Sequence, residues 1–160
     1  MEEIYSKLNV GGSMQVGNIC TRMVISAAPQ TSLGEISNLM KEKEIGAVVI
    51  TEANQAKILG ILTDRDLAVN LAKFKEKLHE TTAEQIMHKE VLTLQKAQDL
   101  KEALIAMRKR CVRRAPVVDQ DNKLVGIITL DDIVSACAET LCEIEHLIKH
   151  QTSFIKCCEC

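Results

Sequence analysis

The stretch "GILTDRDL" at Gly60–Leu67 recurs, altered, as "GIITLDDI" at Gly126–Ile133. The two copies lie 66 positions apart, and a shift of 66 or 67 positions aligns much of the chain with itself. For example, "NICTRMV" at Asn18–Val24 falls over "QIMHKEV" at Gln85–Val91. A repeat longer than about 50 residues that occurs only twice does not build a solenoid, which needs three or more units. The sequence therefore predicts a duplicated domain.

Each copy shows the same order of patterns. Apolar residues at helical spacing come first, in 33–40 and in 100–107. Two short, continuously apolar runs follow, as buried strands require, and a second amphipathic helix closes the copy. Helix, strand, strand and helix in each half predict an α+β fold of α/β type, with the two units packed sheet to sheet. The predicted strands are Ala47–Ile50, Ile58–Thr63, Pro116–Val118 and Leu124–Thr129.

The repeat sets the expected domain boundaries. The first domain is predicted over 16–72 and the second over 83–141, joined by the charged linker "KFKEKLHETT" over 73–82. Residues 1–15 are expected to form an N-terminal arm. Residues 142–160 are expected to form a helical tail with a cysteine-rich end.

Composition excludes several classes of function. The net charge of −2 provides no long-range field for a polyanion, and three aromatic residues are too few for stacking nucleic acid bases. No apolar run is long enough for a membrane span, and no secretory signal is visible. We therefore expect a cytoplasmic protein that binds neither nucleic acid nor membrane. Three of the seven cysteines, Cys20, Cys111 and Cys137, fit apolar patterns and are interpreted as reduced thiols in the core.

The Thr-x-x-Asp corners, 63–66 and 129–132, lie where a predicted strand turns into a helix. One interpretation is helix capping, in which the threonine and the acidic residue accept hydrogen bonds from free backbone N–H groups. The other is ligand binding, because a carboxylate at a helix start can accept both hydroxyls of a ribose. Gly60 and Gly126 would let another group approach the strand closely. The residues alone favour neither interpretation over the other.

Matching phrases occur in the same order and at similar spacing in the two copies. The first copy contains "NICTRMV", "IGAVVITE" and "GILTDRDL", and the second contains "QIMHKEV" and "VRRAPVVDQDNKLVGIITLDDI". In the order and spacing of these phrases the chain resembles a tandem pair of cystathionine β-synthase (CBS) domains over roughly Val16–Leu141. The resemblance implies a pseudo-twofold module with two clefts between the copies. In members that bind a ligand, these clefts take AMP, ADP, ATP or S-adenosylmethionine.

The resemblance also implies roles for single residues. Asp66 and Asp132 would bind ribose, and the adenine would lie against the first strands. Thr21 stands where family members often have a threonine that faces the cleft, whereas the second copy has His88 there, which makes the two clefts unequal. The predicted nucleotide-binding residues are Thr21, Ile45, Gly46, Ala47, Thr63, Asp66, Val112, Arg113, Arg114, Ala115, Pro116, Thr129 and Asp132.

The basic patch "RKRCVRR" at Arg108–Arg114 divides into two parts. Arg113 and Arg114 fall where the family often places basic residues near phosphate, whereas copy one has Gly46 and Ala47 there. Because phosphate binding favours a fixed guanidinium, one cleft is expected to hold phosphate more strongly than the other. Residues 108–110 are expected at a helix C-terminus, where cations suit the helix dipole.

The tail allows two interpretations. Leu141, Ile144, Leu147 and Ile148 form an apolar stripe that would pack on a partner. The alternative is a zinc site, since Cys and His residues recur at ligand spacing, although only one Cys-x-x-Cys is present. No metal is predicted, and the weak candidates are Cys142, His146, His150, Cys157 and Cys160.

No arrangement of side chains favours catalysis, so the chain is not expected to be an enzyme or to require a cofactor. The prediction is a regulatory sensor, a homodimer that binds an adenosine nucleotide or S-adenosylmethionine as its regulatory ligand and acts on an unknown protein. Two alternatives stay open. One is a protein-interaction scaffold with empty clefts, and the other is a metal- or redox-responsive protein that uses the Cys/His tail.

Overall fold

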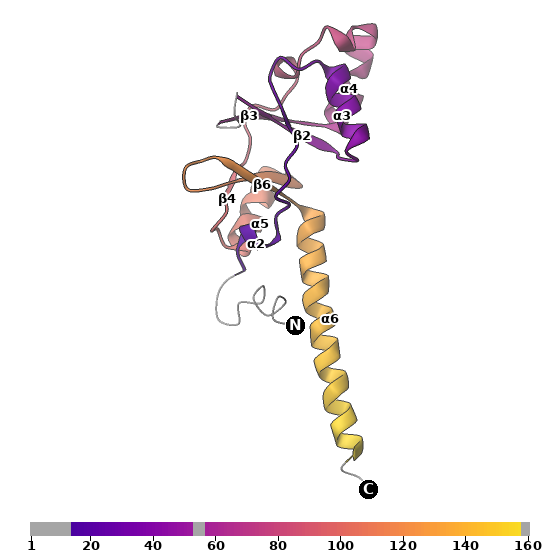
Figure 1. The fold of residues 1–160 in the computed structure, drawn as a ribbon, viewed down its shortest axis with the longest axis vertical. Helices are drawn as coiled ribbons and strands as arrows, with labels where there is room; N and C mark the ends of the chain where they lie inside the picture. The colour runs from indigo at the N-terminus through magenta and orange to yellow at the C-terminus, as the bar shows by residue number, and fades with distance from the viewer. Residues whose placement is uncertain (1–13, 53–56, 158–160) are drawn as a thin grey trace.

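The computed structural model describes residues 14–52 and 57–157 of the chain (Figure 1). Two three-stranded sheets, ordered β1-β2-β3 and β4-β5-β6, each carry their own helices. In each sheet the first two strands are parallel and the last two are antiparallel. The predicted α+β architecture of two similar units is therefore confirmed.

The elements of the first half are α2 (Val16–Ile19), β1 (Ser26–Ala27), α3 (Leu33–Glu42), β2 (Ala47–Thr51), β3 (Ile58–Thr63) and α4 (Asp64–Phe74). Two 3₁₀ helices follow, η2 (Lys75–His79) and η3 (Ala83–Gln85). The second half contains β4 (Leu94–Gln95), α5 (Leu100–Arg110), β5 (Arg114–Val118), β6 (Leu124–Thr129) and α6 (Leu130–Cys157).

Local sequence explains where the two packing helices begin. Ser32 and Glu35 form a capping box at the start of α3, in which each side chain accepts a hydrogen bond from the other residue's backbone. Asp99 caps α5 by accepting hydrogen bonds from the backbone of Lys101 and Glu102. Each helix then turns its apolar residues toward its own sheet, so the two hydrophobic cores form separately.

The two repeats exchange their first segments. Val16 of α2 is fully buried in the core of the second repeat, beside Leu94 and Ala103, although it lies at the start of the first. Conversely, Ala83 of η3 is buried in the core of the first repeat. Each hydrophobic core therefore contains residues from the start of the other sequence repeat, so the cores do not follow the repeat boundaries at 16–72 and 83–141.

The exchanged segments explain the repeated glycines. Thr21 exchanges two backbone hydrogen bonds of 2.9 Å with Ile127 of β6, and His88 pairs in the same way with Ile61 of β3. A Cβ atom at Gly126 would lie 2.7 Å from Sγ of Cys20, and one at Gly60 would meet the segment around His88 as closely. The predicted close approach to these glycines is confirmed, and the approaching group is the exchanged backbone.

The predicted linker over 73–82 is largely helical. Helix α4 continues to Phe74, and η2 follows at once. Phe74 and Leu78 pack against the core of the first repeat, and Thr81 is buried with its hydroxyl bonded to the carbonyl of Lys77. The segment therefore belongs to the packing of the first unit.

The cysteines correct one prediction. Cys20 is half-buried, and burial raises the pKa of its thiol. Cys111 and Cys137 are exposed, so the prediction that they lie in the core is wrong. Cys111 ends α5 in a left-handed conformation (φ 54°). Cys137 lies on α6. Both thiols are free.

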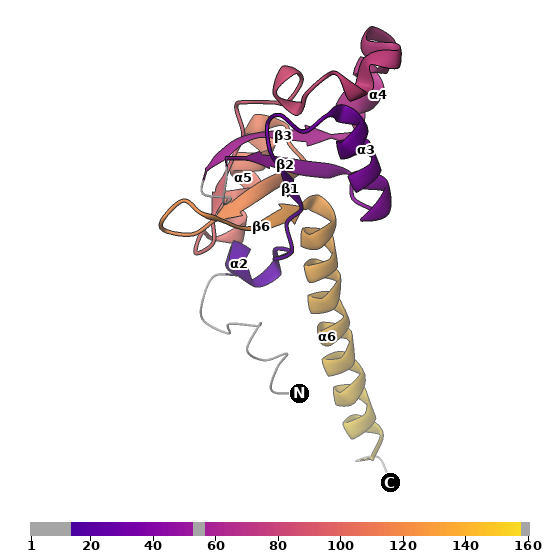
Figure 2. The same cartoon turned by 45° about the horizontal axis from the view of Figure 1, so that its top comes forward.

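Helix α6 is one continuous element of 28 residues that projects away from the sheets (Figures 1 and 2). The predicted tail is therefore the extension of the second repeat's last helix. The predicted N-terminal arm lies almost entirely outside the described residues. In the part of the chain that the structure describes, no helix has the length and hydropathy to cross a membrane.

Candidate functional site

The first Thr-x-x-Asp corner is a capping box at the start of α4. Oδ2 of Asp66 accepts hydrogen bonds from the backbone N–H (2.8 Å) and the hydroxyl (2.6 Å) of Thr63. In return the backbone N–H of Asp66 donates to Oγ1 of Thr63 at 3.3 Å. The reciprocal bonds satisfy backbone groups that a helix start leaves without partners.

The second corner repeats this geometry at the start of α6. Oδ2 of Asp132 accepts from the backbone and the hydroxyl of Thr129, both at 2.7 Å, and its own N–H donates to Oγ1 of Thr129 at 3.2 Å. The capping interpretation is therefore confirmed for both corners. One carboxylate oxygen of each aspartate is committed to the cap, and the other oxygen distinguishes the two sites.

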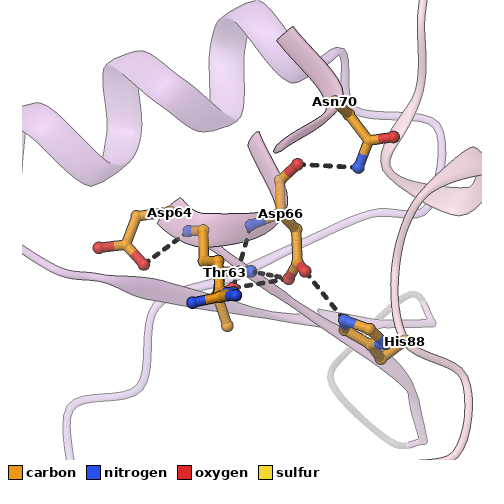
Figure 3. Close-up of polar contacts among 6 residues, drawn as sticks. Thr63, Asp64, Asp66, Asn70 and His88 are labelled. Atoms are coloured by element: carbon orange, nitrogen blue, oxygen red, sulfur yellow. Dashed lines mark hydrogen bonds and ion pairs between the residues drawn. The ribbon is translucent and has the colours of Figure 1, made fainter. Parts of the chain in front are cut away.

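In the first corner that other oxygen is occupied as well (Figure 3). Nε2 of His88 lies 2.9 Å from Oδ1 of Asp66, whose side chain is only 15% exposed. Burial works against the charge of Asp66, but the hydrogen bonds from Thr63 and His88 outweigh it and hold the pKa of this carboxyl below its usual range. The Asp66 carboxylate therefore has protein partners on both oxygens.

In the second corner Oδ1 of Asp132 accepts no hydrogen bond from any described residue. Thr21 occupies the place that His88 has in the first corner, as the matching pairs of Thr21 with Ile127 and His88 with Ile61 show. Asp132, Thr129 and Thr21 line a cleft of about 180 Å³. We call it the Asp132 cleft.

Both repeats contribute to the Asp132 cleft. The first repeat supplies Ile45, Gly46 and Ala47 at the start of β2, and the second supplies Thr129, Asp132 and Arg114. Apolar walls, two hydroxyls, one carboxylate and one guanidinium thus face the same space. A ligand that fills it touches both repeats.

Arg114 lies in this cleft because residue 46 has no side chain. A Cβ atom at Gly46 would come 3.1 Å from Nη1 of Arg114 and 3.2 Å from Oδ2 of Asp64. Within the described chain the Arg114 guanidinium makes no ion pair and no hydrogen bond. Its charge is thus available to an anion.

The structure brings seven predicted residues into one cleft: Thr21, Ile45, Gly46, Ala47, Arg114, Thr129 and Asp132. Thr63 and Asp66 form the other corner with His88. Val112 and Arg113 are exposed and do not line the Asp132 cleft, whereas Ala115 and Pro116 are buried in the core of the second repeat. The cleft also includes residues that sequence reasoning missed, namely Met23, Val24, Ile25 and Ile127. The exchanged segment brings the first three there, and no local motif marks them.

The zinc candidates are placed only in part. Cys142 and His146 are exposed on α6, and no three His, Cys, Asp or Glu side chains gather into a possible metal site within the described residues. The side chains of His150 and Cys157, and all of Cys160, lie outside the described part. The candidate metal site therefore stays untested.

Comparison with known sequences identifies both repeats. The model of the CBS domain matches residues 16–73 and again 83–139. An uncharacterized protein of Methanopyrus kandleri, MK0525, is 34% identical over 137 residues, which are 86% of this chain and 69% of that protein. An inosine-5′-monophosphate dehydrogenase of Methanocaldococcus jannaschii is also 34% identical, over 111 residues, but the match spans only 21% of that longer protein.

Solved structures agree with this assignment. The AcuB protein of Vibrio cholerae has a TM-score of 0.73 and 31% identity, with 84% of this chain and 98% of that chain covered. The CBS domain pair of protein MJ0100 has a TM-score of 0.69 and 28% identity, and the match covers 81% of this chain and 99% of that one. That domain pair was solved in complex with 5′-methylthioadenosine and S-adenosyl-L-methionine. The chain described here belongs to the CBS domain family and contains two CBS domains in tandem.

Proposed function

We propose that this chain is a regulatory module that binds an adenosine-containing ligand in the Asp132 cleft. The observation that carries the proposal is the Oδ1 atom of Asp132, which no described residue occupies and which lies in a cleft shared by both repeats. The complex of the MJ0100 domain pair with two adenosine compounds supports the same class of ligand.

The chemistry of the cleft suits the parts of a nucleoside. Oδ1 of Asp132 would accept hydrogen bonds from ribose hydroxyls, as acidic residues do in dinucleotide-binding folds. The hydroxyls of Thr21 and Thr129, which also line the cleft, would add polar contacts. Ile45 and Ala47 offer an apolar surface for the base, which suits a chain with hardly any aromatic rings.

The guanidinium of Arg114 favours an anionic group next to the nucleoside. Arginine matches phosphate oxygens with paired, charge-assisted hydrogen bonds. The proposal therefore ranks AMP, ADP and ATP above S-adenosylmethionine and methylthioadenosine, which carry no phosphate. The ligand is a regulatory signal, and no further cofactor and no catalytic step belong to the proposal.

The cleft is small for a whole nucleotide. Its volume of about 180 Å³ lies below the roughly 300–1,000 Å³ of typical ligand sites. The ligand would stay partly exposed or would separate the two repeats slightly. Since a ligand shifts an equilibrium only by its different affinity for two arrangements, such a separation is the change that a regulated protein could detect.

Calorimetric titration tests the proposal. AMP, ATP, S-adenosylmethionine and methylthioadenosine would each be titrated into the wild-type protein and into Asp132→Ala. We expect heat from at least one phosphate-bearing compound and a loss of affinity in the variant. Absence of heat from all four compounds, or equal affinity in both proteins, would refute the assignment.

A matched control separates binding from stability. Asp132→Ala removes a helix cap as well as a ribose acceptor, and losing such a cap costs roughly 0.5–2 kcal/mol. Glu35→Ala removes the corresponding acidic residue from the capping box at the start of α3, away from the Asp132 cleft. This control should lower the melting temperature similarly and leave ligand affinity unchanged.

A further inference from the structure

Helix α6 carries exposed apolar residues at a regular spacing. Residues 130, 137 and 144 lie seven apart, and so do 134, 141 and 148. Together they form what we call the α6 seam: Leu130, Val134, Cys137, Leu141, Ile144 and Ile148. Val134 is 58% exposed, Leu141 66% and Ile144 48%. Alternating intervals of four and three are the a and d positions of a heptad repeat.

The rest of the helix surface has a different character. The positions that point away from the seam carry Glu139, Cys142, Glu143, His146 and Lys149. Leu147 flanks the seam and widens it. Because α6 projects away from both sheets, the CBS domains leave most of this seam exposed (Figures 1 and 2). A narrow apolar seam with polar residues around it is typical of a helix that packs on another helix of the same pitch.

We propose that a second copy of this chain covers the α6 seam, as a parallel coiled coil in register. A second α6 has the same heptad spacing along the whole seam, so each apolar residue meets its own counterpart. The interface lies outside the Asp132 cleft and does not depend on ligand binding there.

The length of α6 selects the parallel orientation. An antiparallel pair that matched both apolar seams would set Leu130 of one helix beside Ile148 of the other. Residues 149–157 of the second helix would then continue past the start of the first. At 1.5 Å a residue they would extend about 14 Å past that start, toward the end of α6 where the CBS domains lie (Figures 1 and 2). A parallel pair keeps both helix ends free of the CBS domains.

The charges beside the seam are compatible with this pairing. In a parallel coiled coil a residue before one a position faces the residue five places further on in the partner helix. Ile133, the first such residue, is buried in the core of its own repeat, and Thr140 faces Glu145 of the second copy. No like charges meet across these described positions.

The native cysteines report on the register. Cys137 lies on the seam, so a parallel pair in register sets the two Cys137 residues opposite each other. A disulfide needs Cα atoms roughly 4.4–6.8 Å apart, which opposed seam positions allow. Cys142 is exposed on the far side of the helix and serves as a matched control.

The first experiment measures the mass of the full chain by sedimentation equilibrium. We expect twice the monomer mass of 17.7 kDa for wild type. Ile144→Lys, on the seam, should give the monomer mass, and His146→Lys, two residues away but off the seam, should remain dimeric. A monomeric wild type, or a dimer that survives Ile144→Lys, overturns the proposal.

The second experiment cross-links two single-cysteine chains by mild oxidation. One retains Cys137 and the other Cys142, with all other cysteines changed to serine. We expect a disulfide-linked dimer from the Cys137 chain and much slower linking of the Cys142 chain. Equal rates, or faster linking through Cys142, overturn the parallel register. Neither result depends on whether the Asp132 cleft binds a nucleotide.

Discussion

Nε2 of His88 lies 2.9 Å from Oδ1 of Asp66, whereas Thr21, at the equivalent place in the other corner, leaves Oδ1 of Asp132 without a described partner. The caps themselves are nearly identical in the two corners, with hydrogen bonds of 2.6–2.8 Å to the aspartate. The difference between two corners that share one capping geometry is thus the side chain of one exchanged residue. Thr21 leaves Oδ1 of Asp132 available, whereas His88 occupies Oδ1 of Asp66.

Replacing His88 with threonine should free the second carboxylate. In His88→Thr, Oδ1 of Asp66 loses its imidazole partner and resembles Oδ1 of Asp132. We expect calorimetric titration with the ligand of the wild type to show a second, weaker site per chain. It should be weaker because Arg114 serves the Asp132 cleft. A stoichiometry that stays at one would contradict this explanation of the asymmetry.

The converse change should close the site. Thr21→His would bring an imidazole to Asp132, and a hydrogen bond to a charged group contributes about 1.5–3 kcal/mol. Ligand binding must displace it, so affinity should fall about 10- to 100-fold. Thr21→Ser keeps a small hydroxyl and should bind like wild type. Unchanged affinity in Thr21→His would show that residue 21 does not control access to Asp132.

Removing the charge of Arg114 should weaken nucleotides selectively. Arg114→Met keeps an apolar chain but loses the charge-assisted hydrogen bonds, so AMP should bind about 10- to 100-fold more weakly. Adenosine, which has no phosphate, should bind this variant as it binds wild type. Arg113→Met is the matched control, because Arg113 is exposed outside the cleft. Equal losses for AMP and adenosine would argue against a phosphate contact.

Asp66 should make folding stability depend on acid pH. The pKa of this carboxyl is held below its unfolded value of about 3.9 by Thr63 and His88 against the effect of burial. Its charge therefore stabilises the fold above that pH, and the contribution is lost as the pH falls through the folded-state pKa. Urea unfolding should show Asp66→Asn less stable than wild type at pH 7.

The difference in stability between these two proteins should shrink as the pH falls below the unfolded pKa of about 3.9, because protonated Asp66 and asparagine are alike in charge. Glu35→Gln should show the same trend, since the hydrogen bonds from Ser32 lower the pKa of Glu35. A difference that stays constant or widens on acidification would contradict the account of Asp66.

Several elements could be predicted because their patterns are local. The strands Ile58–Thr63 and Leu124–Thr129 appear with the predicted bounds, since each is a continuous apolar run that ends at a helix cap. The helices of 33–42 and 100–110 follow the apolar spacing in the same way. The two-residue strands β1 and β4 are too short for any periodicity, and they were missed.

The exchange of first segments could not be predicted. A duplicated sequence is equally consistent with Val16 packing in its own repeat or in the other, because both cores are built from similar residues. The prediction for Cys137 was wrong for a related reason, since apolar spacing on α6 fits a core face and a coiled-coil seam alike. Capping and ribose binding also use the same aspartate, so the sequence alone could not distinguish them. The structure distinguishes them because capping uses Oδ2 and leaves Oδ1 of Asp132 without a described partner.

The most direct test is a crystal structure of the protein with AMP. The account predicts one nucleotide per chain, in the Asp132 cleft, with a ribose hydroxyl within hydrogen-bond distance of Oδ1 of Asp132 and the phosphate beside Arg114. It also predicts that His88 remains on Asp66. A nucleotide bound at Asp66 with His88 displaced, or bound away from both aspartates, would contradict it.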